Sequence, residues 1–96
     1  MGNKDNIIII SNGDDWEILF VNGEKVLATH SISLRMIMDY LPNLSQPLTL
    51  TLYEYFNEEW EDRESDELYR EVFMIQKYTT FEQLKPLLQN DNFKKY

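Results

Sequence analysis

The feature that most constrains this chain is the Asn-Gly pair at 22–23, which lies between two strand-forming runs, 16–21 and 25–29. Asn-Gly supplies the two positive-φ positions of a type I′ turn, the tight connection of a β-hairpin. A second turn signal, at 12–15, follows the β-branched run at 5–11. The first third of the chain is therefore predicted to form three strands joined by two hairpin turns.

A helix is predicted next. Ser31 or Ser33 can cap it and Pro42 stops it. Its apolar face is expected at i, i+3, i+4 and i+7, which corresponds to Leu34, Ile37, Met38 and Leu41. After Pro47, leucines alternate with threonines and a tyrosine, which predicts a strand of about nine residues that ends near Phe56.

The last third is predicted to add one strand and one helix. β-forming residues favour a central strand at 68–78. Thr79 and Glu82 form a capping-box pattern, and Pro86 should kink or shorten the helix that follows. Its expected buried stripe is Phe81, Leu84, Leu87 and Leu88. The predicted fold is α+β, with the element order β-β-β-α-β-β-α. Two helices pack on one face of a mainly antiparallel sheet of about five strands, and the other face is partly open.

Length and composition exclude several classes of protein. A chain of 96 residues makes one domain, 1–96, with one core. The longest aliphatic run, at 7–10, is too short to cross a bilayer, and no signal peptide opens the chain, so a cytoplasmic protein without a membrane partner is expected. The absence of cysteine excludes disulfide scaffolds and thiolate zinc sites. A net charge of −8 argues against direct binding to nucleic acid.

Catalytic and cofactor-binding patterns are missing. His30 is the single histidine, and a serine–histidine–acid relay with Ser31 or Ser33 would need a spatial arrangement that adjacency in sequence does not provide. We expect His30 to bond backbone groups at a strand-to-helix corner. The three glycines are isolated, so no phosphate loop can form, and the acidic stretch 62–67 lacks the glycine of an EF-hand. No catalytic residue, cofactor or metal is expected, and a very small enzyme that uses His30 is the weakest alternative.

The acidity of the chain is concentrated in one segment, 54–71, which carries nine acidic and two basic residues. The rest of the chain carries eight acidic and seven basic residues, so the segment accounts for −7 of the net charge. Carboxylates this crowded can imitate a row of phosphates, and tryptophan and tyrosine are enriched where binding energy concentrates. The candidate partner-binding residues are Tyr53, Glu54, Tyr55, Glu58, Glu59, Trp60, Glu61, Asp62, Glu64, Asp66 and Glu67.

These features favour a small, non-enzymatic inhibitor that binds a basic partner, a nucleic-acid-binding protein or nuclease, with the acidic segment acting as a DNA mimic. In size, charge and lack of catalytic groups the chain resembles phage anti-defence inhibitors and the immunity proteins of nuclease toxins. Besides the small enzyme that uses His30, three alternatives remain. The first is an immunity-type partner that covers a toxin exosite through Trp60 and the tyrosines. The second is a self-assembling module that pairs the open sheet face or the 48–56 edge with another copy. The expected oligomeric state is therefore either a monomer or, if this pairing occurs, a homodimer. The third is a solubilising loop with Trp60 folded back on Phe56 or Tyr69.

Overall fold

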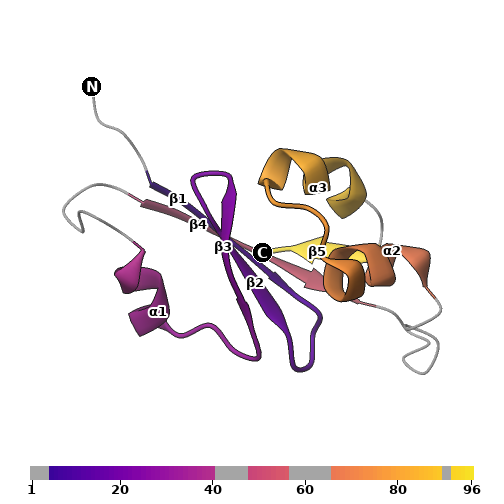
Figure 1. Ribbon diagram of the computed structural model, residues 1–96, viewed down its shortest axis with the longest axis horizontal. Coiled ribbons are helices and arrows are strands. Elements are labelled where there is room, and N and C mark those ends of the chain that lie inside the picture. The colour runs from indigo at the N-terminus through magenta and orange to yellow at the C-terminus, as the bar shows by residue number, and fades with distance from the viewer. Residues whose placement is uncertain (1–4, 41–47, 57–65, 90–91) are drawn as a thin grey trace.

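The computed structural model describes residues 5–40, 48–56, 66–89 and 92–96, which form a five-stranded sheet with helices on both faces (Figure 1). The α+β class and the five strands are therefore as predicted. In space the strands lie in the order β3-β2-β1-β4-β5. Along the chain the elements are β1 (Asp5–Ser11), β2 (Glu17–Val21), β3 (Glu24–Thr29), α1 (Leu34–Asp39), β4 (Leu48–Tyr55), α2 (Glu67–Tyr69), the π-helix η2 (Arg70–Ile75), α3 (Phe81–Leu88) and β5 (Phe93–Lys95).

The first three strands confirm the turn-based prediction. β1 pairs antiparallel with β2, and β2 pairs antiparallel with β3. Asn22 and Gly23 have the expected positive φ angles, 52° and 88°. The turn is also tied to β1, because the Asn22 N–H donates to Asn6 O and the Asn22 Oδ1 accepts from Asn6 N, both at 2.8 Å. Local turn chemistry thus sets the register of this part of the sheet.

One strand pair differs from a purely antiparallel arrangement. β4 runs parallel to β1, with Ile7 beside Leu50 and Ile9 beside Leu52. Its other neighbour, β5, is antiparallel. Because β3 lies at the far edge of the sheet, the chain must cross over β2 and β1, by way of α1, to reach the position of β4. The sheet is therefore mixed, with one parallel pair.

The prediction that both helices pack on one face is wrong. Alternate isoleucines of β1 point to opposite faces of the sheet. On one face Ile8 and Ile10 join a large core that includes residues of η2, α3 and β5. On the other face Ile7 joins a smaller core with Ile37 of α1. A run that is apolar on both faces needs cover on both, and the helices divide to supply it.

Helix α1 is capped as predicted but buries a different face. The Ser33 side chain accepts a hydrogen bond from Met36 N at 3.2 Å. Ile37 is buried, whereas Leu34 is 73% exposed and Met38 is 44% exposed. The predicted four-residue stripe is therefore wrong for these two, and Leu41 lies outside the described residues. A helix of six residues is too short to lay a full stripe on the sheet, so one side chain makes the buried contact.

The strand predicted at 68–78 is also wrong, because 67–75 is helical. Tyr69, Val72 and Phe73 are buried at i, i+3 and i+4, which is the spacing of one helix face. The Asp66 side chain caps this helical stretch by accepting from Leu68 N at 3.0 Å. The stretch ends at Gln76, in the left-handed region with φ 53°. The fifth strand is instead the short β5.

Helix α3 confirms the predicted stripe. Leu84 and Leu88 are buried in the large core, and Phe81 and Leu87 pack against it. The capping box lies one residue later than predicted, with Thr80 as the cap and Gln83 as its partner. Pro86 lies inside the helix, which ends two residues later, as a proline that breaks the hydrogen-bond pattern should cause.

The contrast between buried Ile37 and exposed Leu34 gives a test of how α1 packs. Ile37→Ala should lower the free energy of unfolding by about 2 to 4 kcal/mol, because it opens a cavity under the helix. Leu34→Ala should change it by less than about 0.5 kcal/mol, because Leu34 is exposed. Urea denaturation of both variants measures the difference. Equal losses would contradict the orientation of α1.

Candidate partner-binding site

The structure describes five of the eleven candidate residues. Tyr53, Glu54 and Tyr55 lie in β4, and Asp66 and Glu67 lie at the start of α2. The remaining candidates lie outside the described residues: Glu58, Glu59, Trp60, Glu61, Asp62 and Glu64. Trp60 is one of these residues, so the prediction about its packing also lies outside the described residues. The described geometry therefore concerns the two flanks of the acidic segment.

The two flanks are joined by side chains. The Tyr55 hydroxyl, at the end of β4, donates to Asp66 Oδ2 at 2.5 Å. The Asn92 side-chain amide also donates to Asp66 Oδ2, at 3.3 Å, while Asn92 O accepts from Phe56 N at 2.6 Å. Hydrogen bonds to a carboxylate are stronger than neutral ones. We call these three residues, Tyr55, Asp66 and Asn92, the clamp, because they join the end of β4 to the start of α2, the two described elements on either side of 57–65.

The clamp rests on a cluster of aromatic rings. Tyr55, Tyr69, Phe73 and Phe93 contact one another with ring centroids 5.1 to 6.2 Å apart. Edge-on and tilted contacts of this kind add to the energy of burial. A buried polar residue, Asn12, extends the cluster, because its Nδ2 donates to the Tyr69 hydroxyl oxygen at 3.3 Å. The base of the acidic segment is thus part of the core.

Burial changes the role of the two tyrosines. Tyr55 is 1% exposed, which leaves its ring no surface for a partner, and it positions Asp66 instead. Tyr53 is half-buried against Phe81, with ring centroids 6.0 Å apart. Both tyrosines lie on the face of β4 that points into the large core, as the alternation along the strand could have indicated. Glu54 lies on the opposite face, across from Lys94 in β5.

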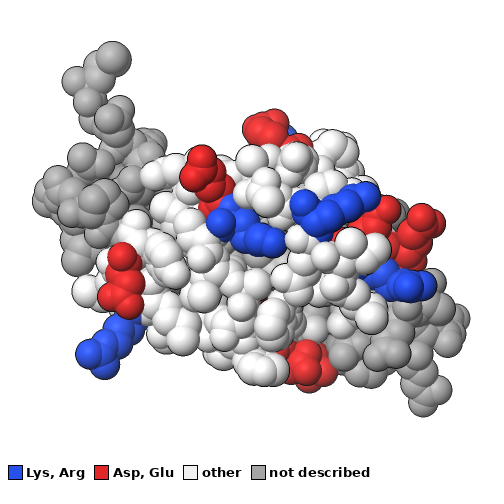
Figure 2. Space-filling model, in the orientation of Figure 1, with Lys and Arg blue, Asp and Glu red and all other residues white. Residues whose placement is uncertain are grey.

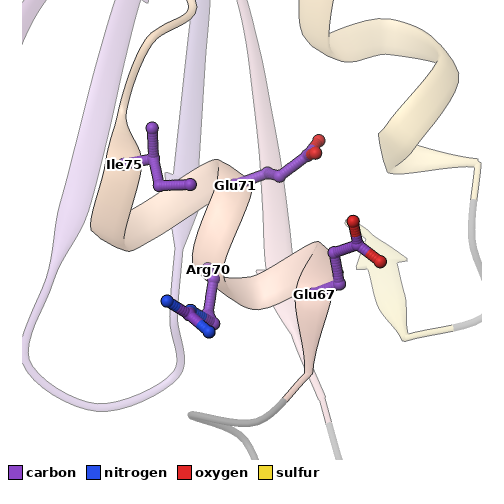
Figure 3. A pocket seen from close by; sticks show the side chains of 4 residues that line it. All are labelled: Glu67, Arg70, Glu71 and Ile75. Carbon is purple, nitrogen blue, oxygen red and sulfur yellow. The ribbon is translucent and has the colours of Figure 1, made fainter.

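Acidic side chains also lie on the helical stretch 67–75. Glu67 is exposed, and in Figure 3 its carboxylate projects to the same side as that of Glu71, while Arg70 points the other way. These three side chains and Ile75 line an open hollow of about 350 Å³. The Tyr78 hydroxyl donates to Glu71 Oε2 at 3.0 Å and orients that carboxylate. Figure 2 shows acidic side chains gathered at the α2 end of the molecule, with basic side chains close by.

Glu71 and Arg70 belong to the acidic segment but are not among the predicted partner-binding residues, because a strand at 68–78 would not place them beside Glu67. In a strand, residues 67 and 71 share a face but lie well apart. In a helical stretch residues four apart are neighbours on the surface. The helical spacing of Tyr69, Val72 and Phe73 was the signal that could have found this surface.

His30 makes the backbone contact expected of it. Its Nδ1 donates to Asp15 O at 3.1 Å, and its ring meets the Trp16 ring edge-on at 5.2 Å. Ser33, one of its two possible relay partners, is engaged as the cap of α1. Within the described parts of the chain, no group of three or more histidine and acidic side chains could hold a metal ion.

None of the described helices is long and apolar enough to span a membrane. Comparisons with protein-family models, with curated proteins and with solved structures found no match.

The clamp can be tested by removing one hydroxyl. Tyr55→Phe should lower the free energy of unfolding by about 1.5 to 3 kcal/mol, because it removes a hydrogen bond to a charged group. It should also speed amide exchange at 66–69, where Asp66 begins the helical stretch. Tyr53→Phe is the matched control, since the Tyr53 hydroxyl has no hydrogen bond to a described residue. Equal stability and exchange in the two variants would argue against the clamp.

Proposed function

We propose that this chain is a non-enzymatic inhibitor whose acidic end binds the basic surface of a nucleic-acid-binding protein and blocks it. The observation that carries the proposal is the clamp, which joins the described residues on either side of 57–65 on an aromatic base. A fixed base reduces the conformational entropy that the segment loses when a partner binds. The chain thus presents charge from a prepared position.

The distribution of charge supports this use. The segment 57–65 holds five acidic residues and one basic residue, a net charge of −4 in nine residues. The described residues hold eleven acidic and seven basic residues, also −4, in a much longer stretch of chain. A local field of one sign accelerates the approach of an oppositely charged surface. A protein that binds nucleic acid offers such a surface, since it holds phosphates through lysine and arginine.

The hollow beside α2 suits a basic side chain. Glu67 and Glu71 supply two carboxylates on one side and Ile75 supplies an apolar wall, while Arg70, which also lines the hollow, points the other way. Lysine and arginine combine an apolar stem with a charged end, so both features can be used by one side chain. Because Tyr78 already orients Glu71, the partner does not have to order that carboxylate on binding.

The test compares two variants of equal net charge. The first replaces Glu58, Glu59, Glu61 and Asp62 with the corresponding amides. The second does the same at four exposed acids of other elements, Asp14, Glu24, Asp39 and Glu82. Each protein is immobilised, exposed to host lysate at low salt and eluted in sodium chloride steps. The proteins captured are then identified and assayed for binding to a labelled DNA duplex.

The wild-type chain and the second variant should retain the same basic protein and displace it from DNA. The first variant should bind that protein with an association rate at least about tenfold slower, because steering depends on local charge. If both variants slow equally, net charge alone acts and the proposal fails. If both bind normally but Trp60→Ala speeds dissociation, the immunity-type exosite mode replaces mimicry.

A further inference from the structure

Among the described residues, only part of the outer edge of β4 has a pairing partner. β5 pairs with Tyr53, Glu54 and Tyr55, and the Tyr96 N–H reaches Leu52 O at 2.8 Å. On this side, no described residue pairs with 48–51, although β1 pairs with 48–54 on the other side. The described part of the sheet therefore has a step, in which 48–51 form a strand edge without a described neighbour next to the end of β5.

Hydrogen bonds along β4 show which backbone groups face this step. Leu52 O accepts from Tyr96 N, and Phe56 N donates to Asn92 O, so even-numbered residues direct their backbone groups toward the β5 side. Backbone groups alternate in direction along a strand. Leu48 and Leu50 consequently aim their N–H and C=O groups at the open edge. Their side chains are also 50% and 58% exposed.

The open part of β4 lacks the charges that protect other edges. The outer strand β3 begins with Glu24 and Lys25, and Glu24 forms a bridge with Thr80. The other outer strand, β5, carries Lys94 and Lys95. Between Leu48 and Tyr53 there is no charged residue, only leucine, threonine and tyrosine. Proteins generally place charges on edges that must not pair.

We propose that two copies of this chain pair antiparallel through 48–50 and form one continuous sheet. Centring a two-fold axis on Thr49 places Leu48 opposite Leu50 of the second copy, and Leu50 opposite Leu48. Both leucines face the edge with their backbone groups, so these two pairs make four N–H···O=C hydrogen bonds. A two-fold axis at Leu50 would instead need Leu52, whose carbonyl already bonds Tyr96.

The same register matches the side chains. Residues directly opposite each other in a sheet point to the same face, so leucine meets leucine on the α1 face and threonine meets threonine on the other. No like charges are brought together. In a two-fold pairing the same stretch of chain must fit a second copy of itself, and 48–50 meets this requirement. This match favours a second copy over an unrelated peptide.

The pairing also keeps the acidic ends apart. β4 has eight residues, and its open end and the clamp are therefore separated by roughly 23 Å. Figure 1 shows the start of β4 and helix α2 at opposite ends of the molecule. Charges further apart than about 8 to 10 Å are largely screened at physiological salt. The dimer would present two acidic ends on opposite sides.

Engineered cysteines test the register, because the natural chain contains none. In Thr49→Cys the two sulfurs lie in a non-hydrogen-bonded pair, with Cα atoms about 4.5 Å apart, which a disulfide can span. In Thr51→Cys the two positions are offset by about 13 Å along the strands, which it cannot. Under mild oxidation we expect a covalent dimer from Thr49→Cys and a monomer from Thr51→Cys. Equal yields from the two variants would overturn the proposal.

Sedimentation of chains without engineered cysteines gives an independent measure of dimer formation. The wild-type chain should show a mass that rises with concentration, and Leu50→Lys should weaken the dimer by at least about tenfold, because it places a charge on the edge. Met74→Lys is the control, since Met74 in η2 is exposed to a similar degree, 55% against 58% for Leu50. A wild-type chain that stays monomeric at millimolar concentration, or a Met74→Lys effect as large as that of Leu50→Lys, would refute the pairing.

Discussion

The burial of β1 on both faces is the constraint on which the rest of this structure depends. Four consecutive isoleucines cannot alternate between core and solvent, so the strand must lie inside the sheet with cover above and below. In 96 residues there is little helix to provide that cover. The large core includes residues of η2 and α3, whereas the described residues that the smaller core receives from outside the sheet are Ile37 of α1 and Ile32 before it. The exposed leucines of β4 follow from this uneven division.

A second feature is that a few polar contacts connect the acidic residue Asp66 to the core. Asp66 is held by the Tyr55 hydroxyl and the Asn92 amide, and it caps the helical stretch with its other oxygen. One carboxylate thus begins a helix and joins it to the end of β4 and to the aromatic cluster.

The sequence was most informative where the signal was local. The Asn22-Gly23 turn, the alternation in β4 and the stripe of α3 depend on neighbouring residues and were predicted correctly. The parallel pairing of β1 with β4 depends on residues about forty apart, which no local pattern encodes. At 68–78, β propensity predicts a strand, but the spacing of Tyr69, Val72 and Phe73 is helical and their packing against the core favours the helix. For the site, the composition of the sequence reveals the acidic segment. It does not reveal the clamp, because Asn92 lies far along the chain from Tyr55 and Asp66.

The parallel pairing of β1 with β4 also bears on how the chain folds. Contacts between residues far apart in sequence form late, because the intervening chain must first be ordered. The hairpins of β1, β2 and β3 can form early, yet the described residues that cover the face carrying Ile8, Ile10 and Phe20 belong to the last third of the chain. During synthesis that face is exposed until η2 and α3 have emerged. The chain therefore has an aggregation-prone interval set by its topology, and a net charge of −8 helps to keep copies apart during it.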